Sequence, residues 1–105
     1  MFKEILIKNV PGHKVFFCND GSTFNNLEEL RKALISMSDE TFNYHVNSEK
    51  NDFANWIYDV IGDIKLANNL RTVGDKKTMA KKIRTRISYI KKNLTNSSDL
   101  ETGSL

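Results

Sequence analysis

Apolar residues in the middle of the chain recur three and four positions apart, which predicts an amphipathic helix. This apolar stripe consists of Phe53, Trp56, Ile57, Val60, Ile61 and Ile64. Ser48 is expected to cap the helix, because its side-chain oxygen can accept a hydrogen bond from a free N–H group of the first turn. Gly62-Asp63 predicts a break, since glycine suits a helix C-terminus and aspartate an N-cap. A short helix with Leu66, Ala67, Leu70 and Val73 should follow and end at Gly74.

Three further helices are predicted from cap residues that precede apolar stripes. Asn26 should cap the first of them, with Glu29 placed to form a capping-box-like pair. Ser38 should cap a second, short helix, and Asp75 should cap the last one. The apolar stripe of the last helix consists of Met79, Ile83, Ile87, Ile90 and Leu94.

The first 25 residues instead carry β-prone clusters separated by turn residues. Phe2–Val10 and His13–Cys18 read as strands, and Pro11-Gly12 separates them. Asp20-Gly21 favours a type I′ hairpin turn. The expected fold is therefore α+β and mainly α, with an N-terminal β-hairpin or three-strand meander packed on four to five helices. Residues 1–95 should form one compact domain, and the polar residues 96–105 a flexible tail.

Composition fits one small globular domain. The 105 residues are 39% hydrophobic and 28% charged, which supplies a modest core and does not predict disorder. No apolar run approaches the roughly 20 residues that span a bilayer. With a single cysteine, Cys18, and no segment that reads as a signal peptide, the expected setting is cytoplasmic, away from membranes.

Charge is distributed unevenly along the chain. Residues 20–63 contain nine acidic and three basic residues, whereas residues 71–92 contain one acidic and nine basic residues. The basic helix 76–92 could therefore contact nucleic-acid phosphates, or could pack against the acidic half. The candidate contact residues are Lys77, Lys81, Lys82, Arg84, Arg86 and Lys91.

Candidate catalytic chemistry is sparse. His45 lies near Asn51, Asp52 and Trp56 in sequence, so these four residues could form a polar cluster that binds a ligand or provides a base. A structural hydrogen bond between His45 and Asp52 is the competing interpretation. Neither zinc-ligand spacing nor a glycine-rich phosphate loop is present. We expect no enzymatic activity, no metal and no cofactor.

Two stretches resemble known proteins. The blocks Tyr44-His45-Val46-Asn47 and Lys50-Asn51-Asp52-Phe53-Ala54-Asn55-Trp56-Ile57 resemble a family of small archaeal and bacterial domains of unknown function. That resemblance implies one compact domain in which His45, Asn51, Asp52 and Trp56 belong together, with no established activity. Residues 100–105, ending in Gly103-Ser104-Leu105, resemble the C-terminal peptides that load cargo into encapsulin shells, although a cloning remnant also explains them.

Together these patterns favour a non-enzymatic module that binds a protein partner. Nucleic-acid binding through the basic helix 76–92 is the first alternative, and an encapsulin cargo role for the tail is the second. The sequence leaves the oligomeric state open.

Overall fold

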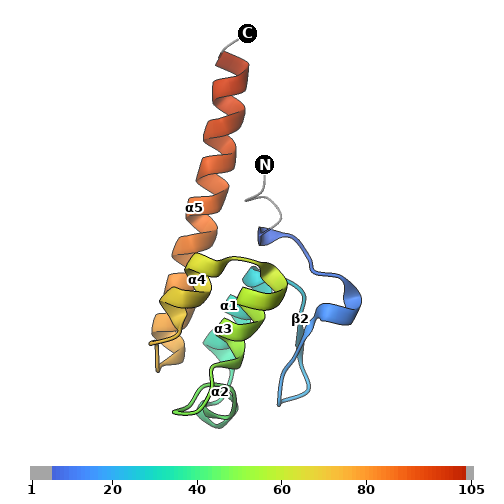
Figure 1. Ribbon diagram of the computed structural model, residues 1–105, viewed down its shortest axis with the longest axis vertical. Coiled ribbons are helices and arrows are strands. Elements are labelled where there is room, and N and C mark those ends of the chain that lie inside the picture. The colour runs from blue at the N-terminus through green and yellow to red at the C-terminus, as the bar shows by residue number, and fades with distance from the viewer. Residues whose placement is uncertain (1–5, 104–105) are drawn as a thin grey trace.

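A computed structural model describes residues 6–103, with side chains described for residues 6–94. Helices make up most of the fold, and a two-stranded antiparallel hairpin lies near the N-terminus (Figure 1). The predicted class, α+β and mainly α, is confirmed. In chain order the elements are η2 Gly12–Lys14, β1 Phe16–Phe17, β2 Thr23–Phe24, α1 Leu27–Ser36, α2 Asp39–His45, α3 Asp52–Trp56, η3 Ile57–Ile61, α4 Ile64–Leu70 and α5 Lys76–Gly103.

The hairpin turn lies where Asp20-Gly21 predicted it, but its type differs. Strands β1 and β2 pair Phe16 with Phe24, and the Cys18 amide donates to the Ser22 carbonyl at 2.9 Å. Only Gly21 within the turn has a positive φ, of 91°. The type I′ prediction is wrong, because that turn needs positive φ at two residues. Residues 18–22 connect the two strands, and the Gly21 amide donates to the Cys18 carbonyl at 3.0 Å within this turn.

A third strand over Phe2–Val10 is not formed by the part of that segment that the structure describes. Leu6 and Ile7 lie in a single 3-10 turn. The Val10 amide donates to the Asn25 carbonyl at 2.7 Å, which ties the segment to the start of α1. Leu6, Ile7 and Val10 pack partly buried against the core. The segment is held by apolar packing and this bond, and the alternative of a three-strand meander is not confirmed.

Helix caps agree with the sequence for α1 and α2. The Asn26 side chain accepts from the Glu29 amide at 2.8 Å, and the Ser38 hydroxyl accepts from the Thr41 amide at 3.1 Å. The Glu29 carboxylate accepts from the Asn25 amide, one residue before the position that a regular capping box uses. Both helix starts are therefore determined by local sequence.

The cap of helix α3 lies three residues later than predicted. Residues 47–50 form a turn, in which the Asn47 amide donates to the Lys50 carbonyl at 2.9 Å. The cap is Asn51, whose side-chain oxygen accepts from the Ala54 amide at 3.0 Å. The prediction of Ser48 as the cap is wrong, because Ser48 lies within this turn and the helix begins only after it.

The predicted break at Gly62-Asp63 is confirmed, but an unpredicted π-helical turn precedes it. In η3 the Gly62 amide donates to the Ile57 carbonyl at 2.8 Å, five residues back, and Gly62 has a φ of 88°. Asp63 then caps α4 through the Leu66 amide. Because the break turns the chain, Ile64 leaves the apolar stripe and is 51% exposed. Helix α4 ends at Leu70, so Val73 lies outside it.

Helix α5 is the longest element and packs lengthwise against α1, while its C-terminal turns project beyond the other elements (Figure 1). The Asp75 carboxylate caps it through the Thr78 amide at 2.8 Å, as predicted. The stripe residues Met79, Ile83, Ile87 and Ile90 are buried, and Leu94 is half-buried. The backbone of residues 96–103 continues the helix; flexibility of the 96–105 tail stays a prediction, and residues 104–105 lie outside the described part.

Candidate functional site

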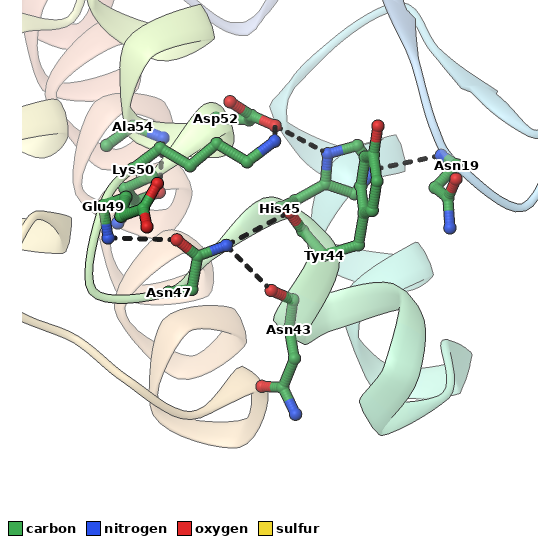
Figure 2. Close-up of polar contacts among 10 residues, drawn as sticks. Asn19, Asn43, Tyr44, His45, Asn47, Glu49, Lys50, Asp52 and Ala54 are labelled. Carbon is green, nitrogen blue, oxygen red and sulfur yellow. Dashed lines mark hydrogen bonds and ion pairs between the residues drawn. The ribbon is translucent and has the colours of Figure 1, made fainter.

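His45, at the C-terminal end of α2, joins the hairpin to α3 (Figure 2). The Asn19 amide in the hairpin turn donates to its Nε2 at 2.9 Å. Its Nδ1 lies 2.9 Å from an Asp52 carboxylate oxygen. The side chain is only 4% exposed. Three segments that are separate in sequence therefore converge on one imidazole.

These contacts assign the tautomer of the imidazole. Because Nε2 accepts a hydrogen bond, the proton of the neutral ring resides on Nδ1 and is donated to Asp52. Both ring nitrogens are thus engaged within the protein. Phe16 and Phe53 pack against the ring at centroid distances of 5.1 and 5.2 Å. The predicted structural hydrogen bond to Asp52 is present, and the geometry offers no nitrogen to a substrate.

Asp52 connects the buried His45 side chain to Lys50 at the protein surface. Its carboxylate also accepts from Lys50 Nζ at 2.9 Å. Burial alone would raise the pKa of Asp52, but the hydrogen bonds from Lys50 and His45 outweigh burial and hold that pKa below its ordinary value. The carboxylate is therefore kept ionised, as the partner of two donors.

We expect Asp52 to make part of the stability of the fold acid-sensitive. A carboxyl whose pKa is depressed by folding stabilises the folded state fully above its unfolded pKa, near 4. That contribution is lost as the pH falls through the folded value. Urea unfolding should show a larger loss of unfolding free energy between pH 6 and pH 3 in the wild type than in Asp52→Asn. Equal losses in both proteins would contradict the assignment.

Asn51 and Trp56 do not join His45 in a single polar site. Asn51 Nδ2 donates to the Leu70 carbonyl at 3.0 Å, so this residue ties the start of α3 to the end of α4. Trp56 Nε1 donates to the Lys14 carbonyl at 2.9 Å. Both residues are buried. Of the four predicted cluster members, His45 and Asp52 meet directly, while Asn51 and Trp56 anchor other parts of the chain.

The lone thiol is buried as well. Cys18 is 7% exposed, and burial raises its pKa above the ordinary value, which keeps it a neutral thiol. Among the described side chains, those of residues 6–94, no three or more His, Cys, Asp or Glu gather where they could hold a metal ion. No helix in the described part of the chain is long and apolar enough to cross a membrane.

The candidate basic residues on α5 separate into different environments. Arg86 forms a two-pronged ion pair with Asp63: Nε to Oδ2 is 2.7 Å and Nη2 to Oδ1 is 3.1 Å. Asp63 is 2% exposed, and the Arg86 side chain 16%. The hydrogen bond from Arg31 is the main cause that lowers the pKa of Glu28 on α1, and the charges of Lys32 and Lys91 act in the same direction. Arg86 therefore pairs with an acidic residue of this chain, and the charge of Lys91 acts on another. Packing against the acidic half was one of the two roles that the sequence allowed for the basic helix.

Three other basic residues of α5 remain exposed to solvent. Lys81, Lys82 and Arg84 make no ion pair or hydrogen bond among the described side chains. Lys77 is exposed too, and its charge acts on neighbouring Asp75. These four cations border two grooves, one on each side of α5.

The first of these, which we call the α1/α5 groove, has a volume of about 350 Å³. Buried Leu34 and Ala80 contribute to its floor, and Ile35 is 64% exposed within it. The remaining lining side chains are all cationic: Arg31, Lys76, Lys77, Lys81 and Arg84. Sequence reasoning missed Ile35, although an apolar residue adjacent to the Leu27, Leu30 and Leu34 stripe was a readable signal.

The second, the α4/α5 groove, has a volume of about 610 Å³ and a more polar lining. Tyr89 is 49% exposed, and the Arg86 guanidinium lies over its ring at 5.4 Å. Hydroxyl, amide and ammonium groups supply most of the other walls. The remaining lining residues are Lys65, Leu66, Asn69, Thr78, Lys81, Lys82 and Thr85.

Comparison with known proteins adds one relationship. A model of a protein family of unknown function matches residues 19–103, which is most of the chain. No curated protein and no solved structure matches.

Proposed function

The chain belongs to a family of unknown function, DUF5752, and we propose that it is a non-enzymatic protein-interaction module that binds an acidic amphipathic helix in the α1/α5 groove. The observation that carries the proposal is Ile35, an isoleucine 64% exposed in a groove bordered by cations. The family description names no activity that competes with this proposal.

The shape and composition of the groove favour a helical partner. Helices α1 and α5 pack against each other, and the lining of the groove covers residues 76–84 of α5, more than two helical turns, so the groove can accept a third helix alongside α5. Apolar groups at Leu34, Ile35 and Ala80 provide a strip for an apolar helix face. Helix-in-groove recognition uses this combination of an apolar strip and side chains placed every three or four residues.

The positive charges that line the groove favour an acidic partner. Two of the cations in the lining already have acidic neighbours: Arg31 pairs with Glu28 at 2.7 Å, and Lys76 lies 3.1 Å from Asp39. Lys81 and Arg84 make no such pair among the described residues. An occupant with carboxylates beside its apolar face would therefore gain complementary charge, whereas a basic one would be repelled.

The reactive side chains support a non-enzymatic role. Both nitrogens of His45 are engaged, the Cys18 thiol is buried, and Asp63 is neutralised by Arg86. General base catalysis needs a group that can reach a substrate proton, and nucleophilic catalysis needs an activated nucleophile. These three groups serve the fold instead.

A peptide panel tests the proposal. We expect a designed helical peptide with an apolar face and flanking glutamates to bind, with Ile35→Asp and Arg84→Glu each weakening it roughly tenfold. Isothermal titration calorimetry measures affinity, and circular dichroism checks that each variant is folded. Ile64→Asp is the matched control, because Ile64 is also an exposed isoleucine, at 51%, but does not line the groove.

Peptide controls separate recognition from charge attraction. A scrambled peptide of equal charge but without an apolar face should bind at least tenfold more weakly. Equal binding of both peptides, or a loss caused by Ile64→Asp as large as that caused by Ile35→Asp, would overturn the proposal.

A further inference from the structure

We propose a second binding site in this protein: the α4/α5 groove takes a single-stranded nucleic acid. The proposal is independent of helix binding, because the two grooves lie on different sides of α5 and share only Lys81. It rests on the donors that line the groove, on the pairing of Asp63 with Arg86 and on an exposed aromatic ring.

The walls of the α4/α5 groove match the needs of a phosphate backbone. Lys65, Lys81 and Lys82 supply ammonium groups, and Lys81 and Lys82 have no ion pair among the described side chains. Thr85 adds a hydroxyl group, which commonly donates to phosphate oxygens alongside lysine, whereas Thr78 is hydrogen-bonded to Asp75. None of the lining side chains is acidic. The lining itself therefore presents no carboxylate to a polyanion, although the Asp75 carboxylate lies beside Thr78.

Two carboxylates accept hydrogen bonds from residues of the groove lining, Asp63 from Arg86 and Asp75 from the Thr78 amide. Asp63 is 2% exposed and accepts both hydrogen bonds from Arg86. The ion pair also keeps Arg86 over the Tyr89 ring. Arg86 thus has a positioning role: it is held by Asp63 and supports one face of the tyrosine.

Tyr89 favours a single strand over a duplex. Its ring is 49% exposed at the groove. An unpaired base can stack on an aromatic ring, which every base permits, whereas a base inside a duplex is already stacked on its neighbours. One ring beside several ammonium groups predicts binding with little sequence preference and strong salt dependence.

Fluorescence anisotropy with a labelled 12-nucleotide oligo-dT strand tests the site on the full chain. The slope of log affinity against log salt should fall in magnitude by about 0.7 in Lys82→Gln, because one phosphate contact to a single strand is lost. Lys77→Gln is the matched control: Lys77 is exposed on the same helix but lines only the α1/α5 groove. Equal changes in both variants would show diffuse attraction and overturn the site.

The aromatic contribution is tested separately. Tyr89→Ala should weaken binding roughly tenfold, and Tyr89→Phe should bind like the wild type, because stacking needs the ring and not the hydroxyl. Unchanged affinity in Tyr89→Ala, or equal affinity for a duplex of the same length, would overturn single-strand binding. Competition by polyglutamate as effective as that by unlabelled oligo-dT would instead assign the groove to acidic protein. Ile35→Asp should leave oligo-dT affinity unchanged, so failure at either groove can be told apart.

Discussion

Replacement of Arg86 by methionine should cost about 3–5 kcal/mol of unfolding free energy, because it leaves a buried carboxylate without its partner. Asp63 is 2% exposed, and both of its oxygens accept from Arg86. One of them also caps α4 through the Leu66 amide at 3.1 Å. The loss should appear as a lower midpoint in urea unfolding, with little change in slope.

A second substitution separates the cost of the lone charge from the value of the pair. Asn is a good N-cap, so Asp63→Asn combined with Arg86→Met removes both charges and keeps the α4 cap. The double variant should recover much of the stability, since a buried ion pair often contributes little beyond its apolar replacement. Lys82→Met, at an exposed position on the same helix, should change stability by less than about 0.5 kcal/mol. A double variant as unstable as Arg86→Met would contradict this account.

Replacement of His45 by alanine should be about as damaging, at roughly 3 kcal/mol or more. Loss of a large buried ring leaves a cavity beside Phe16 and Phe53, and cavities of this kind cost several kcal/mol. The Asn19 amide also loses its partner, and the Asp52 carboxylate keeps only Lys50. Thermal and urea unfolding would measure the loss.

The reason for that loss can be resolved with two matched variants. His45→Phe keeps an aromatic ring but not the nitrogens, so it should cost roughly 1–3 kcal/mol, the loss of two hydrogen bonds at about 0.5–1.5 kcal/mol each. Tyr44→Phe is the neighbouring control, because Tyr44 is 53% exposed and its change should be within about 0.5 kcal/mol. His45→Phe with wild-type stability would show that the Asn19 and Asp52 contacts do not stabilise the fold.

Both proposed sites are lined by residues of α5. The basic residues of this helix therefore serve either to pair with acidic residues of the chain or to line a groove. Arg86 forms an ion pair with Asp63, and the charge of Lys91 acts on Glu28. Lys81, Lys82 and Arg84 remain in solvent beside the two grooves. The uneven charge seen along the sequence is therefore partly balanced inside the fold, and the remaining cations make up the two proposed binding surfaces.

Local sequence was sufficient for most elements, because caps and apolar stripes act over one or two turns. Asn26, Ser38 and Asp75 begin their helices as predicted, and the stripe of α5 is buried through Ile90. Ser48 failed as a cap because the turn at residues 47–50 forms its own hydrogen bonds first. The π turn before Gly62 was not predicted, because the apolar residues of this segment have the same spacing as those of an ordinary α-helix.

The amino-acid sequence by itself determined the helical class, the hairpin position, the break at Gly62-Asp63 and the uneven charge, since each depends on residues close together in the chain. Tertiary structure alone decided which polar groups meet: His45 with Asn19, Asn51 with Leu70, and Arg86 with Asp63, 23 residues away. It also left Ile35 exposed beside the cations of α5. Such pairings follow from how the helices pack, and no periodicity along one segment contains that information.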